Sequence, residues 1–165
     1  MTRRFVVIVA AVAVVSCSSP KPEVPVKNTI TRQEANDRVD KYISDSVTSL
    51  APSPRLEPLG REDAGDCSDP TDNGPLGRVI ASRDYWLRDV PKSRNAEVVA
   101  SLVRWWQDHD FVVRNDDRPK ENWVLVENRV DGFRMSVQES SQGDLSLGAT
   151  SPCVWPNGTP APQTT

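Results

Sequence analysis

The sequence has few of the residues on which enzyme active sites are most often built, since its 165 residues include one histidine and three cysteines. It also has no excess of positive charge: 20 Lys and Arg against 23 Asp and Glu give a formal net charge of −3. A general nucleic-acid binder needs a basic face that displaces counterions from phosphate, so we do not expect nucleic acid as a partner. No motif predicts a cofactor. The length fits a single domain.

The N-terminal residues have the pattern of an export signal. Arg3 and Arg4 precede eleven apolar residues that run from Phe5 to Val15. As a helix this run would be about 16 Å long, whereas a bilayer core needs about 20 apolar residues. We therefore predict that residues 1–16 are a signal peptide and not a membrane span.

The signal is followed by Val14-Val15-Ser16-Cys17, which has the form of a lipobox. In that motif the cysteine sulfur receives a diacylglycerol group, and cleavage leaves the cysteine as the first residue. Two or three acyl chains anchor a protein stably, since each buried CH₂ contributes about 0.8 kcal/mol. We predict lipidation at Cys17 and an anchor on the extracytoplasmic face of the cell membrane. The alternative is an ordinary secreted protein in which Cys17 is a free thiol.

The mature chain divides into a tether, one domain and a tail. Residues 17–30 contain three prolines and no apolar periodicity, which is typical of an extended tether. The domain is expected over residues 31–156, and residues 157–165 form a polar, frayed tail. Within the domain, residues 51–77 are interpreted as one long loop that is rich in proline, glycine and aspartate.

The patterning predicts two helices. Thr31-Arg-Gln-Glu34 is a capping box, and an apolar stripe follows it as far as Leu50. A second stripe begins after Pro91, includes Trp106 and ends at His109-Asp110.

Alternating or β-branched segments predict strands over residues 78–87, 111–114, 123–130, 133–139 and 144–149. Asp131-Gly132 predicts a two-residue hairpin turn between two of them. The fold class is therefore α+β: a two-layer sandwich with two helices packed on a four- to five-stranded, mainly antiparallel sheet.

With Cys17 assigned to lipid, Cys67 and Cys153 remain as a pair in a compartment where disulfides persist. We predict that they form a disulfide that ties the loop over residues 51–77 to the last strand. Two free thiols are the alternative. A metal site is not expected, because there is no C-x-x-C motif and one histidine does not complete a tetrahedral site.

Three segments, residues 77–87, 131–137 and 145–156, resemble a group of small lipoproteins of actinobacteria. The resemblance implies an envelope lipoprotein, and because the group has no assigned activity it supplies no catalytic residues. The chain departs from the expected pattern at Asp110, where glycine is the usual residue after a helix.

Catalytic interpretations are weak. His109 lies at the predicted end of a helix, where a protonated histidine interacts favourably with the helix dipole. No nucleophile motif accompanies it. Four carboxylates lie near predicted loops: Asp116, Asp117, Glu121 and Asp131. A pair of them would suit a glycosidase only if the distance between the two carboxyl groups were suitable.

Calcium is also poorly supported. Residues 69–74 resemble the start of an EF-hand loop, but Thr71 and Ile80 replace two of its ligands.

The five tryptophans, against two tyrosines, are the unusual proportion in this sequence. Trp106 fits a helix stripe, whereas Trp86, Trp123 and Trp155 lie near strand or chain ends, where aromatic rings stack on sugars or peptides. Arg134 alternates off the expected core face and is a polar neighbour for such a surface. Closure of the core rim is the alternative role of these tryptophans.

These features favour a membrane-anchored envelope lipoprotein that acts as a non-catalytic binding or accessory module for a protein or cell-wall partner. A small envelope hydrolase, or an inactive relative of one, is the alternative hypothesis.

Overall fold

The computed structural model describes residues 27–67 and 74–160. The predicted signal peptide and Cys17 therefore lie outside the described residues, as does most of the stretch that resembles an EF-hand loop. The elements are α1 (Arg32–Thr48), β1 (Arg55–Asp66), β2 (Val79–Arg88), the short 3₁₀ helix η1 (Lys92–Arg94), α2 (Asn95–Asp108), β3 (Phe111–Asp116), β4 (Trp123–Asn128), β5 (Arg134–Glu139) and β6 (Leu145–Thr150). Neither α-helix in this part of the chain is long and apolar enough to cross a membrane.

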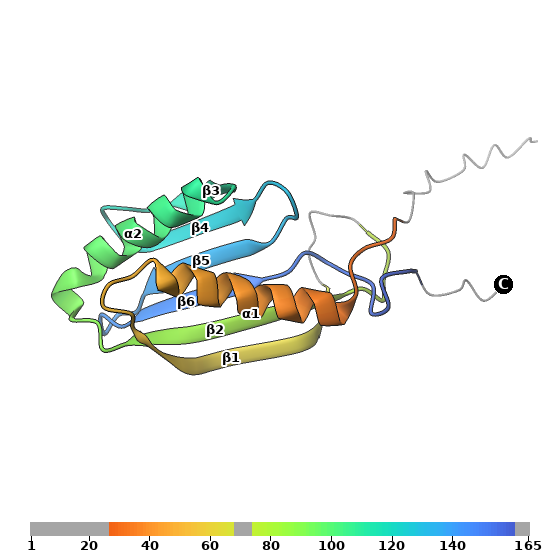
Figure 1. Cartoon of the computed structure of the whole chain (residues 1–165), viewed down its shortest axis with the longest axis horizontal. Coiled ribbons are helices and arrows are strands. Elements are labelled where there is room, and N and C mark those ends of the chain that lie inside the picture. Colours follow the sequence, from red (N-terminus) through yellow and green to blue (C-terminus); the bar gives the residue numbers. More distant parts are fainter. Residues whose placement is uncertain (1–26, 68–73, 161–165) are drawn as a thin grey trace, which may run out of the picture.

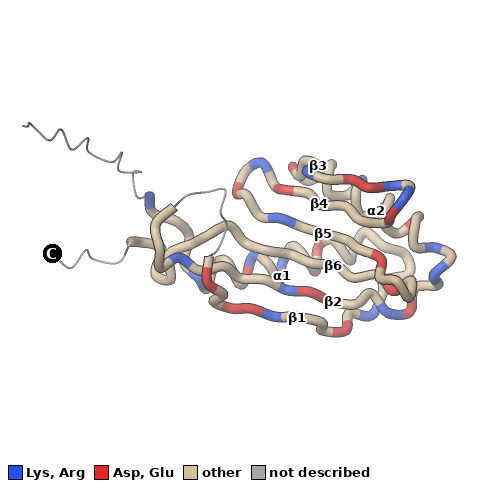
Figure 2. Tube along the Cα trace, turned by 180° about the vertical axis from the view of Figure 1, so that it is seen from behind, with Lys and Arg blue, Asp and Glu red and all other residues tan. Residues whose placement is uncertain are grey.

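The strands form one antiparallel sheet in the order β1-β2-β6-β5-β4-β3. Both α-helices pack on the same face of this sheet (Figure 1). Seen from behind, the strands lie in front of both helices (Figure 2). The predicted α+β sandwich with two helices is confirmed. The expected number of four to five strands is too low, because the sheet has six.

The missed strand is β1, which lies within the segment interpreted as a loop over residues 51–77. Pro58, Gly60 and Gly65 hide it in the sequence, because proline and glycine are depleted in central strands. As an edge strand, β1 pairs only with β2, so a proline without an amide hydrogen is tolerated there. The register shifts between Pro58 and Gly60 and again between Glu62 and Gly65.

Helix α1 begins as predicted. The Thr31 hydroxyl accepts a hydrogen bond from the Glu34 amide (3.2 Å), and the Glu34 carboxylate accepts one from the Thr31 amide (2.7 Å). The hydrogen bond from the Thr31 amide, and a second one that the Thr31 hydroxyl donates to the Glu34 carboxylate (2.8 Å), lower the pKa of Glu34. The expected stripe faces the sheet, since Ala35, Val39 and Ile43 are buried.

Helix α2 also follows the prediction. Its buried side contains Val99, Leu102 and Trp106, and the Trp106 indole donates to the Ser46 hydroxyl of α1 (3.0 Å). The helix ends at Asp108 with His109 as its C-cap, and Asp110 has a φ of 65°. Asp110 thus takes the left-handed conformation for which glycine was expected.

A hairpin joins β4 to β5, but its loop is longer than the predicted two residues. The Asn128 amide donates to the Phe133 carbonyl (2.8 Å), which leaves four residues, 129–132, in the loop. The Asn128 side chain accepts from the Val130 amide (2.9 Å) and thereby stabilises the wider turn. Gly132 supplies the positive φ of 75° that the turn requires.

The two chain ends of the domain are fastened together. The predicted disulfide between Cys67 and Cys153 is confirmed. Beside it, the Thr29 amide donates to the Gly158 carbonyl (2.9 Å), and the Trp155 indole donates to the Lys27 carbonyl (3.1 Å). Residues 27–30, expected in the tether, and Asn157 and Gly158, expected in the tail, are therefore in the ordered body.

Replacing both Cys67 and Cys153 by alanine should lower the free energy of unfolding by about 4 kcal/mol, because the bridge restricts the unfolded chain over a long loop. The two residues are 86 positions apart. Urea unfolding measures the change, and Cys17→Ala, which leaves the bridge in place, is the matched control. Rapid alkylation of Cys67 in the native, unreduced protein would contradict the bridge.

Candidate functional site

The candidate site lies on the face of the sheet opposite the helices, which we call the open face. Side chains alternate along each strand, so residues between the buried ones point away from the helices. The pairing registers place Trp86, Ser146, Gln138 and Trp123 in one row across four neighbouring strands. Strands are spaced by about 4.8 Å, so the two tryptophans stand roughly 14 Å apart.

The tryptophans of this row differ from the tryptophans of the core. Trp106 and Trp155 are buried, and their indole N–H groups donate to protein acceptors. Trp86 and Trp123 are only partly buried, and no residue in the described ranges accepts a hydrogen bond from either indole. The Arg88 guanidinium lies over the Trp86 ring, 5.2 Å from its centroid. Both N–H groups and the remaining ring surfaces are available to a ligand.

Two of the residues predicted for a partner surface, Trp86 and Trp123, are thus brought together on one face. The prediction for Trp155 is wrong, because this side chain is 5% exposed and packs where the two chain ends meet. The sequence signal, a tryptophan near a chain end, does not separate a surface residue from one that closes the core.

Arg134 also lies on the open face, but in another row. Its guanidinium donates to Glu127 (2.9 Å), which also accepts from Arg114 (2.6 Å). Burial alone would raise the pKa of Glu127, but these hydrogen bonds outweigh it and the pKa is lowered. Arg134 is four residues from Gln138 along β5, which is roughly 13 Å, so it is not beside the tryptophan row.

A concave pocket of about 310 Å³ adjoins Trp123. Trp123 and Gln138 line it together with Asn122, Glu139 and Ser140. The Asn122 amide donates to the Glu139 carboxylate (2.6 Å), and the Glu139 backbone amide donates to the Asn122 carbonyl (3.0 Å). These bonds fix part of the wall of the pocket.

Asp84 is the residue of this face that the sequence analysis did not single out. It lies in the row next to the tryptophans, between Gly60 on β1 and Gly148 on β6. No residue in the described part of the chain donates a hydrogen bond to its carboxylate. Burial raises the pKa of Asp84 above its usual value of 3.8.

The other acidic candidates are bound by neighbouring groups. Asp131 accepts from Arg38 (3.0 Å) and from the Tyr42 hydroxyl (2.8 Å), which ties α1 to the β4–β5 hairpin. Asp116 is paired with Arg118, and Asp117 accepts from the Asn115 amide; Glu121 lies 3.6 Å from Lys120. These contacts favour a structural role for the four carboxylates.

His109 is exposed at the end of α2. Its ring stacks on Trp105 with a centroid distance of 4.0 Å, and Nδ1 lies 2.7 Å from the Trp105 carbonyl oxygen. No group of three or more His, Cys, Asp or Glu residues that could hold a metal ion is present within residues 27–67 and 74–160.

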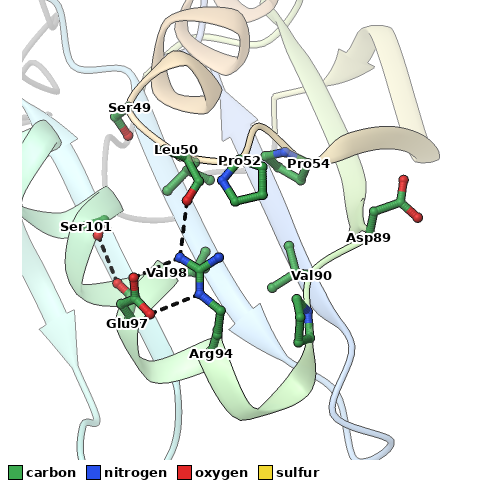
Figure 3. Close-up of a pocket in the computed structure, with 12 residues that line it drawn as sticks. Ser49, Leu50, Pro52, Pro54, Asp89, Val90, Arg94, Glu97, Val98 and Ser101 are labelled. Carbon is green, nitrogen blue, oxygen red and sulfur yellow. Dashed lines mark hydrogen bonds and ion pairs between the residues drawn. The ribbon is translucent and has the colours of Figure 1, made fainter.

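A second cavity, of about 170 Å³, lies between the end of α1 and the start of α2 (Figure 3). Arg94 donates to both carboxylate oxygens of Glu97 (2.8 and 3.0 Å) and to the Ala51 carbonyl (3.2 Å). The principal polar side chains of this cavity are therefore paired with one another, whereas Asp84 of the open face has no such partner in the described ranges. The open face is the stronger candidate site.

Comparison with protein families, with curated proteins and with solved structures gives no match to this chain. The assignment of the site therefore rests on its own geometry.

Trp86→Ala and Trp123→Ala should each cost about 1 kcal/mol of stability, since both side chains are partly exposed. Trp106→Ala and Trp155→Ala should cost about 3–5 kcal/mol, because each leaves a cavity in the core. Thermal and urea unfolding distinguish the two groups. If Trp123→Ala were as destabilising as Trp106→Ala, Trp123 would be a core residue.

Asp84→Asn should stabilise the protein at pH 7. The pKa of Asp84 is raised in the folded state, so the stability it contributes is present below its unfolded pKa and is lost as the pH rises through the folded value. The gain in melting temperature should therefore be present at pH 7 and vanish below about pH 4. Glu121→Gln, in an exposed loop, is the control. A lower melting temperature for Asp84→Asn at pH 7 would mean that the native fold stabilises the charge.

Proposed function

We propose that this chain is a lipid-anchored, non-catalytic binding module of the cell envelope, held on the extracytoplasmic face of the membrane through Cys17. The lipobox and the preceding signal pattern support the anchor. The disulfide between Cys67 and Cys153 is consistent with a compartment outside the cytosol. In this proposal the open face engages a protein or cell-wall partner.

The observation that supports the binding role is the row of side chains from Trp86 to Trp123, which also contains Ser146 and Gln138. The backbone groups of the inner strands are used in the sheet, so this face recognises a partner through side chains alone. It offers two partly exposed indoles with amide and hydroxyl groups between them. Large rigid rings of this kind provide contact area at a small cost in conformational entropy.

The position of the row also suits a partner that lies away from the membrane. Residues 27–30, which precede α1, are bonded to the segment after β6 at one end of the molecule (Figure 1). β2 starts at this end, where Val79 pairs with Val154, and reaches Trp86 near its other end. Trp123 is the first residue of β4. The other end of β4 leads into the hairpin, whose Gly132 lies near Pro152 and therefore at the same end of the molecule as Val154. The tryptophans therefore lie toward the end far from the proposed anchor.

The alternative of an envelope hydrolase would use His109 or the loop carboxylates. His109 stacks on Trp105 as a helix-terminal residue, and the carboxylates are bound by neighbouring groups. These contacts favour the binding role over the catalytic one.

Photo-crosslinking in cells tests the proposed face. A photoreactive amino acid at Gln138, in the middle of the row, should crosslink to a defined partner. The same amino acid at Arg104, on the exposed side of α2, is the control and should give no such product. Equal crosslinking from both positions, or crosslinking from Arg104 alone, would contradict the proposal.

Cys17→Ala should abolish lipidation and leave precursor or released protein, because the substitution removes the sulfur that the lipid is attached to. The measurement is partition between aqueous and detergent phases, in which the parent protein enters the detergent phase. Globomycin should cause the diacylated, uncleaved form of the parent to accumulate. A variant that still partitions into detergent would rule out anchoring through Cys17.

A further inference from the structure

Asp84 differs from the other carboxylates of the open face. Glu57 accepts a hydrogen bond from Arg88 (2.8 Å), and Glu127 is bound by Arg134 and Arg114. Asp84 lies between these two ion pairs, yet no arginine or lysine in the described ranges pairs with it. A partly buried charge without a partner destabilises a fold, and residues of this kind are concentrated at functional sites.

The absence of a side chain at Gly148 lets the Asp84 carboxylate and the Ser136 hydroxyl lie over this residue on the open face. A Cβ atom on Gly148 would lie 2.6 Å from Asp84 Oδ1 and 2.8 Å from Ser136 Oγ. On the other side, a Cβ atom on Gly60 would lie 3.4 Å from Asp84 Oδ2. Any side chain at position 148 would therefore push the carboxylate and the hydroxyl out of their positions. A ligand that lies on the open face over Gly148 meets these two oxygen acceptors together.

The tryptophan row lies beside Asp84 and Ser136. Trp86 follows Asp84 by two residues on β2, and Gln138 follows Ser136 by two residues on β5, so all four side chains share one face. We propose that Asp84 and Ser136, together with Trp86 and Trp123, form a binding site for a neutral, hydroxyl-rich glycan chain. In this site the Asp84 carboxylate accepts hydrogen bonds from sugar hydroxyls, and the two indoles stack on sugar rings at either end.

Other ligand classes fit this geometry less well. A cage for an organic cation places aromatic rings around one point, whereas Trp86 and Trp123 stand roughly 14 Å apart. A peptide that adds a strand pairs with a sheet edge, which here is β1 or β3 and not the middle of the face. An anionic ligand would be repelled by the unpaired carboxylate. A chain of several flat, neutral rings can contact both tryptophans and Asp84 together.

The inference rests on the proposed binding role and names the ligand class, so its test measures glycan binding directly. The full-length protein in detergent is titrated with soluble chito-oligosaccharides and cello-oligosaccharides, and tryptophan fluorescence reports binding. Asp84→Asn should weaken binding about tenfold or more, because a hydrogen bond to a charged acceptor is replaced by one to an amide. Asp45→Asn on α1 and Trp105→Phe on α2 are the matched controls and should bind like the parent.

Gly148→Ala provides a second variant. Its Cβ atom would displace the Asp84 carboxylate and the Ser136 hydroxyl, so we expect loss of glycan binding. Melting temperatures of all variants show whether a loss of binding has a structural cause. Ser136→Ala, which removes the hydroxyl beside Asp84, is measured if Gly148→Ala does not fold, and it should also weaken glycan binding.

Two results would overturn the glycan site: parental affinity in Asp84→Asn, or no binding of either oligosaccharide by the folded parent protein. Failure of this inference is distinguishable from failure of the proposed function. If a protein partner is crosslinked from Gln138 but no glycan binds, the proposed binding module is supported and the glycan site is rejected. Loss of the crosslink as well as of glycan binding would reject both.

Discussion

The arrangement of the whole sheet depends on Arg83, a charged residue buried beneath α1. Its guanidinium is 1% exposed and donates to Asn36 and Asp40 of α1, each at 2.8 Å. It also pairs with Asp63 of β1 at 2.8 Å and donates to the Glu62 carbonyl. A buried cation is tolerated only where acceptors surround it, so α1 and β1 must both lie against β2 at this point. One side chain therefore fastens the helix layer and the edge strand to the sheet.

The same constraint determines what the open face displays. Successive residues of a strand point to opposite faces, so once Arg83 faces α1, Asp84 and Trp86 must face away. Both α-helices cover one side of the sheet. On the other side the fold retains an unpaired carboxylate and two partly exposed indoles. A face selected only for stability would cover such groups or pair them, whereas binding sites retain them at a cost in stability.

The parts of the fold that were predicted correctly have strong local patterns. The capping box at Thr31 and the stripes of α1 and α2 depend on neighbouring residues, and the later strands show alternation. β1 was missed because Pro58 and Gly60 are tolerated only at an edge, and edge position is a property of the whole sheet. Trp86 and Trp123 were found because aromatic side chains are visible in a sequence. Asp84 was not found, since its neighbours on the open face, Gly60 of β1 and Gly148 of β6, are distant from it along the chain.

The central claim is that the open face, and not the helix layer, is covered by a partner in the cell. Oxidative footprinting of tryptophan side chains tests it without knowledge of the ligand, by comparing intact cells with the purified protein. Trp105 of α2 is the internal reference, since it is partly exposed on the helix side of the molecule. The account predicts that Trp86 and Trp123 are oxidised less in cells than in the purified protein, while Trp105 is oxidised equally in both. Equal oxidation of all three tryptophans in cells and in solution would contradict it.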